Sequence, residues 1–248
     1  MTTTDLTLTD TGTGRPALVL HGGGGPATVA MLAEHLATTM RAILPTHPGW
    51  NGTARPESIT SIPDLATRYL NLLDELDLTD VLVVGSSLGG WIGGEMAVGD
   101  TNGRITQLVL LDAVGIDIPG HPMTDFFALD ARGVAEHAFH DSARFYVDPA
   151  TLTPEQAAIT QSNLATMKVL AGDPYMHDPE LQPKLAAVRI PTLLMWGESD
   201  RIATLAYGEA YAGAFANAQL TIIPEAGHLP QIEQPAATFT ALDSFIAR

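Results

Sequence analysis

The segment VLVVGSSLGG, residues 81–90, decides the fold of this chain. Its first four residues are apolar and mostly β-branched, as in a buried strand, and the residues that follow the second serine favour a helix. Between the two lies a G-x-S-x-G pattern centred on Ser87. So sharp a turn holds the serine in a strained backbone conformation and exposes its hydroxyl above the sheet edge. It leaves no space for a Cβ atom two residues to either side, which is why Gly85 and Gly89 suit it.

Short apolar runs alternate with stretches of helical spacing along the rest of the chain. This alternation predicts an α/β fold with a mostly parallel central sheet, right-handed crossovers and helices on both faces. Groups that do chemistry then belong at the carboxyl ends of the strands. Strands are expected near residues 6–8, 17–20, 42–44, 81–84, 105–111, 192–196 and 220–223, and helices near 28–40, 62–78, 203–216 and 235–247.

The strand pattern disappears between Gly115 and Ala187. Aromatic and methionine residues occur there with helical spacing in pieces, and prolines interrupt them. A structureless loop of that length would be unusual in a compact domain. We therefore expect residues 116–187 to form a helical cap subdomain, inserted into an α/β core made of residues 1–115 and 188–248.

Composition narrows the range of partners. The chain has 248 residues, with 12 basic and 28 acidic side chains and a net charge of −16. That charge argues against binding to nucleic acid and to anionic membranes, which leaves a small-molecule substrate as the expected partner. The absence of cysteine excludes disulfides, thiolate metal sites and a cysteine nucleophile. No signal peptide and no membrane-spanning run is visible, so a cytoplasmic location is expected; the oligomeric state is left open.

Ser87, in the tight turn, and two residues that follow predicted strands, Asp200 and His228, have complementary chemistry. A serine hydroxyl is a poor nucleophile until a base removes its proton, and His228 is the candidate base. A carboxylate must then orient the imidazole and stabilise its charged form, and Asp200 is the candidate. Asp112 also ends a strand and is the alternative acid.

A glycine run follows the first buried strand, in the sequence His21-Gly22-Gly23-Gly24-Gly25. Successive glycines carry a large conformational-entropy cost, so they need a reason. Downstream of a strand and upstream of the Ser87 turn, they favour a loop whose amide N–H groups bind a developing oxyanion. His21 is expected to position this loop rather than to react.

With these segments in place, the chain resembles an α/β-hydrolase fold protein over essentially its full length. The segments that carry the resemblance are HGGG at residue 21, GSSLGG at residue 85, WGESD at residue 196 and AGH at residue 226. The resemblance implies Ser87 as nucleophile, Asp200 as acid and His228 as base. It also implies an oxyanion hole made by the amide of Leu88 and one amide of the Gly22–Gly24 loop, for which we favour Gly23. His47-Pro48-Gly49 departs from the family, where many members have an aspartate before the Pro-Gly pair.

Several readings of the function stay open at this point. The first is a serine hydrolase that acts through an acyl-enzyme on a small, mainly apolar ester or lactone. The second is hydrolysis of a carbon–carbon bond in a β-diketone type substrate, and the third is a non-catalytic ligand-binding protein of the same fold. His137 and His140 could share a helix face, but no further ligand clusters with them, so no metal or cofactor is expected.

Overall fold

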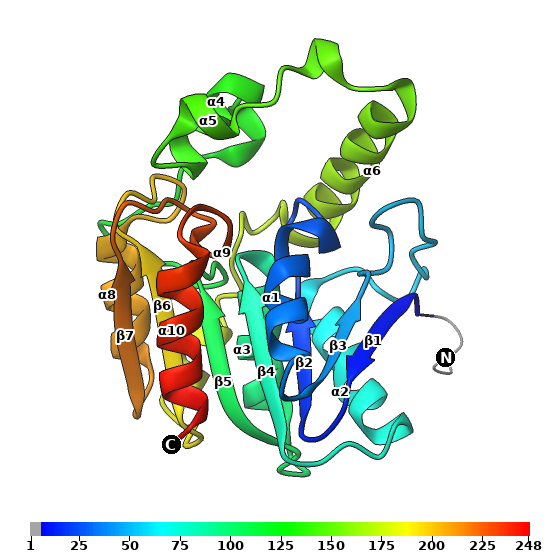
Figure 1. Ribbon diagram of the computed structural model, residues 1–248, viewed down its shortest axis with the longest axis vertical. Helices are drawn as coiled ribbons and strands as arrows, with labels where there is room; N and C mark the ends of the chain where they lie inside the picture. The colour runs from blue at the N-terminus through cyan, green and yellow to red at the C-terminus, as the bar shows by residue number, and fades with distance from the viewer. Residues whose placement is uncertain (1–5) are drawn as a thin grey trace.

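A seven-stranded sheet forms the centre of the molecule in the computed structural model, which describes residues 6–248 (Figure 1). The strand order is β1-β3-β2-β4-β5-β6-β7, and every neighbouring pair is parallel except β1 with β3. The predicted fold class, a mostly parallel α/β sheet flanked by helices, is therefore confirmed. The strands are β1 Leu8–Gly12, β2 Pro16–Leu20, β3 Arg41–Pro45, β4 Val81–Ser86, β5 Ile105–Leu111, β6 Thr192–Gly197 and β7 Ala218–Ile223.

Two apolar cores cover the two faces of the sheet. Successive residues of β2 divide between them, because side chains alternate along a strand: Leu18 and Leu20 face one core, and Ala17 and Val19 face the other. The first core includes side chains from α2 Ile62–Glu75, α3 Leu88–Gly99, α7 Leu181–Leu185 and α8 Leu205–Ala214. The second includes side chains from α1 Ala30–Leu36 and α10 Pro235–Ile246, which follows the short helix α9 Pro230–Glu233.

Some elements differ from the sequence predictions at their ends. β1 continues to Gly12, beyond the strand expected near residues 6–8, because Thr11 and Gly12 pair with Ala42 and Arg41 of β3. The helix expected over residues 28–40 divides into η2 Pro26–Val29 and α1. The expectation that no signal peptide is present concerned the N-terminal residues, and residues 1–5 of these lie outside the described part of the structure.

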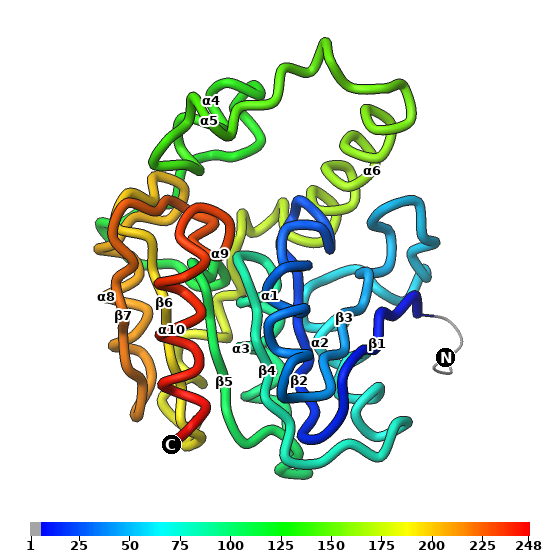
Figure 2. The backbone as a smooth tube through the Cα atoms, in the orientation of Figure 1, coloured from blue at the N-terminus to red at the C-terminus, as the bar shows by residue number. Residues whose placement is uncertain are grey.

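The segment between β5 and β6 is helical, as predicted. It contains η3 Phe126–Ala128, α4 Ala131–Ala138, α5 Ser142–Phe145, η4 Pro149–Thr151 and α6 Pro154–Ala171, followed by α7. Figures 1 and 2 show this segment as an arch over the carboxyl ends of the strands, with α4 and α5 on one side and α6 on the other. The division of the chain into a core and a separate cap stays a prediction. In the part of the chain that is described, no helix is both long and apolar enough to cross a bilayer.

Candidate active site

Ser87 lies at the sharp turn between β4 and α3. Its backbone has φ 55° and ψ −117°, a conformation that costs a non-glycine residue about 1–3 kcal/mol and persists only where its surroundings enforce it. A Cβ atom on Gly85 would collide with the carbonyl of Gly89, and one on Gly89 would collide with the carbonyl of Leu20. The two glycines of the motif are therefore required by close backbone approach, as the sequence indicated.

His228 and Asp200 reach Ser87 from the loops that follow β7 and β6. The Nε2 atom of His228 lies 2.8 Å from the Ser87 hydroxyl, and its Nδ1 lies 2.8 Å from Oδ2 of Asp200. Oδ1 of Asp200 accepts backbone N–H groups from Ile202 and Ala203, which fixes the carboxylate. His228 and Asp200 are 7% and 4% exposed, so little water competes for these bonds. The structure thus brings together the three residues that the sequence selected.

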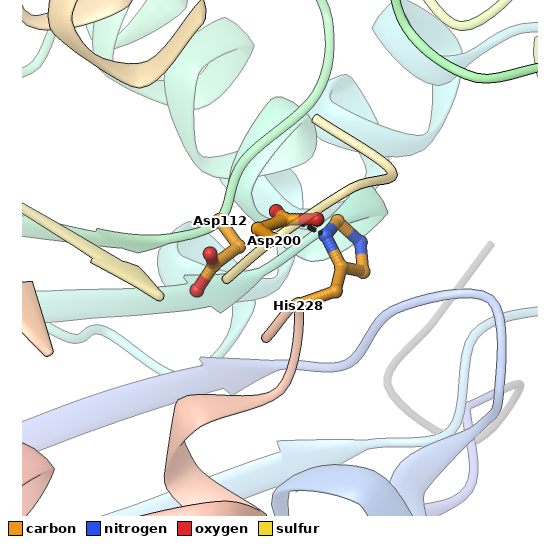
Figure 3. A group of neighbouring side chains, drawn as sticks. All are labelled: Asp112, Asp200 and His228. Carbon is orange, nitrogen blue, oxygen red and sulfur yellow. Dashed lines mark hydrogen bonds and ion pairs between the residues drawn. The ribbon is translucent and has the colours of Figure 1, made fainter. Parts of the chain in front are cut away.

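Asp112 is close to this group but does not bond to the histidine. It lies on the other side of Asp200 from His228, as Figure 3 shows. Its side chain is fully buried: Oδ1 accepts the backbone N–H of Gly197, and Oδ2 has no hydrogen-bond partner among residues 6–248. Burial, together with the charge of Asp200, raises the pKa of the Asp112 carboxyl well above its usual value. Asp200 accepts two backbone N–H groups and contacts His228, whereas burial and the neighbouring carboxylate favour the neutral form of Asp112.

The glycine loop beside Ser87 is held by a buried network around two histidines. Nδ1 of His21 donates to the carbonyl of Gly22, and its Nε2 accepts the backbone N–H of His47. The ring of His47 donates from Nε2 to the carbonyl of His21 and accepts the Tyr69 hydroxyl at Nδ1. The His21 ring is therefore neutral, because its Nε2 accepts an N–H, and a neutral His47 ring fits a hydrogen bond donated by the Tyr69 hydroxyl.

The pKa values of these two histidines agree with their neutral form. Burial lowers the pKa of His21 to about 4. Burial, and then the neighbouring His21, hold the pKa of His47 well below its usual value. The departure from the family pattern at His47 thus forms part of the support of the glycine loop.

The residues expected to supply the two oxyanion-hole amides, Gly23 and Leu88, lie next to Ser87 in the cavity lining. The carbonyls of Gly22 and Gly23 are occupied, the first by His21 and the Gly25 N–H and the second by the indole N–H of Trp50. Leu88 is the first residue of α3, where a backbone N–H has no acceptor within the helix. Both Gly23 and Leu88 line the cavity that contains Ser87.

That cavity has a volume of about 170 Å³ and a mainly apolar lining. Ser87, His228 and the glycine loop form its floor, and residues of the β5–β6 segment cover it. The covering side chains include Met123, Phe126, Phe139, Met167, Tyr175 and Met176. Within residues 6–248, no lysine or arginine lines this cavity.

The paired histidines of the β5–β6 segment are not brought to a common site. His137 bonds to the carbonyl of Gly133 within its own helix, whereas His140 contacts the Ser199 hydroxyl. In the described part of the chain, the cluster with metal-ligand geometry is Asp112, Asp200 and His228. Its imidazole and the carboxylate of Asp200 are already bonded to each other, so the arrangement fits proton transfer to and from Ser87.

Glu233 is a site residue that the sequence did not reveal. Its buried carboxylate accepts three backbone N–H groups, from Gly227 beside the catalytic candidate His228 and from His140 and Asp141 of the β5–β6 segment. The backbone N–H of His228 also bonds to the carbonyl of Ala138. The loop that carries His228 is thereby tied to the segment that covers the cavity. Nothing in the local sequence around Glu233 shows these long-range partners.

The sequence matches the Alpha/beta hydrolase family over residues 17–241. The chain belongs to this family. It is 26% identical to a 2-hydroxymuconate semialdehyde hydrolase of Pseudomonas sp. (strain CF600), over 97% of this chain and 89% of that protein. It is a hydrolase of the α/β fold.

Two solved structures share the fold. One is the meta-cleavage product hydrolase CumD from Pseudomonas fluorescens IP01, with a TM-score of 0.78 and 20% identity, covering 98% of this chain and 94% of that one. The other is a thermophilic esterase from Thermogutta terrifontis, with a TM-score of 0.74 and 23% identity, covering 98% and 93%. The same fold is thus shared with a meta-cleavage product hydrolase and with an esterase.

Proposed function

We propose that the protein is a serine hydrolase that cleaves a small, uncharged, mainly apolar ester or lactone through an acyl-enzyme. The observation that carries this proposal is the pair of 2.8 Å contacts that link Ser87, His228 and Asp200 in a chain. A hydroxyl, an imidazole and a carboxylate in this order can move a proton off the serine as it attacks.

The proposed reaction proceeds in two halves. Oγ of Ser87 bonds to the substrate carbonyl carbon while its proton passes to Nε2 of His228, and the carbonyl π electrons move onto oxygen. The amides of Gly23 and Leu88 stabilise that oxyanion. Collapse breaks the bond to the leaving oxygen, which takes the proton from His228. Water then attacks the acyl-Ser87 ester by the same route, releasing the acid and restoring the serine.

The lack of cationic side chains in the described lining of the Ser87 cavity favours an uncharged substrate. Within the described residues, the lining of the Ser87 cavity includes no cation that could neutralise a carboxylate. Burying an unpaired carboxylate costs several kcal/mol, whereas an apolar group gains about 25 cal/mol for each Å² removed from water. Discrimination of about 3 kcal/mol corresponds to roughly a hundredfold in kcat/KM.

Hydrolysis of a carbon–carbon bond is the second candidate, and its support is the similarity to the 2-hydroxymuconate semialdehyde hydrolase. Leu229 follows His228 here, where carbon–carbon hydrolases that resemble this chain usually have a tryptophan. An anionic diketo acid would also lack a cationic partner in the cavity lining described above.

The test compares substrates matched in length but not in charge. Purified protein is assayed with p-nitrophenyl butyrate, p-nitrophenyl hemisuccinate and a vinylogous diketo acid, with Ser87→Ala as the blank. We expect kcat/KM for the butyrate to exceed that for the hemisuccinate by about a hundredfold. Faster cleavage of the diketo acid than of any ester or lactone would favour the second candidate. A failure of Ser87 to react with a fluorophosphonate probe would favour a binding protein.

A further inference from the structure

A second, larger cavity adjoins the one that contains Ser87. It has a volume of about 490 Å³ and lies between the two sides of the β5–β6 arch, with residues of η3, α4 and α5 on one side and of α6 on the other. Ser87 does not line it. The two cavities meet at a boundary made of residues common to both: Gly23, Gly24, Phe126, Val134, Phe139 and Met167. We call the first the inner pocket and the second the outer chamber.

Met167 is the boundary residue that the α6 side contributes. Its side chain is 5% exposed and lies against the backbone of Gly23, so closely that a Cβ atom on Gly23 would collide with its sulfur. Gly23 supplies one of the proposed oxyanion amides. Met167 therefore lies beside the expected position of the reacting carbonyl, on the side that faces the outer chamber. A methionine has an unbranched, flexible side chain, and it can change rotamer without movement of the helix.

The helix that carries Met167 is itself fixed. Asn163 accepts the backbone N–H of Asn51 and donates to its side-chain oxygen, and the Thr166 hydroxyl donates to the carbonyl of Gly49. These bonds join the middle of α6 to the loop after β3. Passage between the inner pocket and the outer chamber therefore depends on the Met167 side chain rather than on movement of α6.

The outer chamber presents apolar surface to solvent. Val147 and Leu164, two of the five large apolar side chains that are exposed among the described residues, line it and are 60% and 40% exposed. Phe127, Leu129 and Phe145 line it as well. Its polar lining side chains are those of Asp130, Thr160 and Asn163, and the last of these is already bonded to Asn51.

We propose that the outer chamber is a binding subsite for a linear, uncharged hydrocarbon chain of the substrate, and that Met167 is the gate through which this chain leaves the inner pocket. The inference rests on the proposed function for the reacting carbonyl and adds the substrate class: an ester with one chain too long for the inner pocket. Met167 is thus a specificity-determining residue that controls chain length. Each methylene buried beyond the gate is expected to raise the rate of reaction about fourfold.

Covalent labelling of Ser87 tests the gate without requiring turnover. Second-order rate constants are measured for alkyl fluorophosphonates from ethyl to dodecyl, by intact mass, with wild-type protein and with Met167→Ala, Met167→Phe and Val169→Ala. Val169 is a matched control because it lies on the same helix, is 55% exposed and lines neither cavity.

In the wild type we expect the labelling rate to rise with chain length. Met167→Ala should increase the dodecyl-to-ethyl rate ratio at least threefold, Met167→Phe should reduce this ratio at least tenfold, and Val169→Ala should leave it unchanged. Equal ratios in all four proteins would overturn the proposal. If the Met167 variants fail to fold, Val147→Asp at the exposed edge of the chamber decides, since it should slow dodecyl labelling alone.

The labelling rates and the ester assay test the chain-binding subsite and the proposed ester hydrolysis separately. Chain-length dependence that moves with Met167, in a protein that hydrolyses no ester, would retain the subsite and refute the ester reaction. Ester hydrolysis together with labelling rates that do not depend on chain length would support the ester reaction and refute the subsite.

Discussion

Replacing each of the two buried aspartates by asparagine separates their roles. Oδ1 of Asp200 accepts two backbone N–H groups, so an asparagine there must keep its oxygen on that side. Its NH₂ group would then face Nδ1 of His228, which is 2.8 Å from Oδ2 in the native protein. The imidazole would be held as the tautomer with its proton on Nε2. That nitrogen could no longer accept the serine proton, and we expect Asp200→Asn to lower kcat by about 10⁴, or roughly 5 kcal/mol of transition-state stabilisation.

Asp112→Asn is the matched control, because it makes the same chemical change one strand away. Burial and the neighbouring Asp200 carboxylate favour the neutral form of the native side chain, which accepts one N–H from Gly197. An asparagine can accept that N–H and carries no charge, so kcat should change by less than about threefold. Both variants are assayed with p-nitrophenyl butyrate, and urea unfolding confirms that each is folded. A severe loss in Asp112→Asn with a mild one in Asp200→Asn would refute the assignment.

Three further predictions concern the same site. Ser87→Ala and His228→Ala should each lower kcat by several orders of magnitude and the double variant should be barely worse, whereas losses that multiply would show that the two residues act separately. Burial lowers the pKa of His21 from 6.5 in the unfolded chain to about 4 in the folded protein, so on acidification protons bind the unfolded chain first. His47, whose pKa is also lowered, acts in the same direction, and the free energy of unfolding should fall by at least about 2 kcal/mol between pH 7 and pH 5. Urea titrations that give the same free energy at both pH values would contradict the neutral network. Glu233→Gln places an NH₂ group against a backbone N–H and should lower the free energy of unfolding by about 1–3 kcal/mol relative to the exposed control Glu209→Gln, and equal stability of the two would contradict its anchoring role.

Local signals in the sequence were sufficient for the turn at Ser87. The strand, the two glycines and the helix are adjacent in the chain, and backbone collisions at Gly85 and Gly89 make the glycines necessary. The order of the strands along the chain was enough to place Ser87, Asp200 and His228 at one edge of the sheet. The order of the strands did not exclude Asp112 as the acid in place of Asp200. Both aspartates follow neighbouring parallel strands, and they differ in the groups that their carboxylate oxygens contact.

The site features that the sequence did not predict depend on contacts between segments far apart in the chain. His47 was visible only as a departure from a family pattern, and its role depends on His21 and Tyr69, which come from two other elements. Glu233 gathers backbone groups from residues 227, 140 and 141, a set that no periodicity or motif indicates. The boundary between the two cavities depends on a methionine against a glycine more than a hundred residues earlier.

Detection of the acyl-enzyme tests the central claim most directly. Wild-type protein is mixed with p-nitrophenyl butyrate, quenched in acid during the first turnover and analysed by intact mass and peptide mapping. We predict a burst of p-nitrophenol together with one butyryl group on the peptide that contains Ser87, and neither in Ser87→Ala. Steady turnover without an acylated Ser87 during that burst, or turnover that persists in Ser87→Ala, would contradict the account.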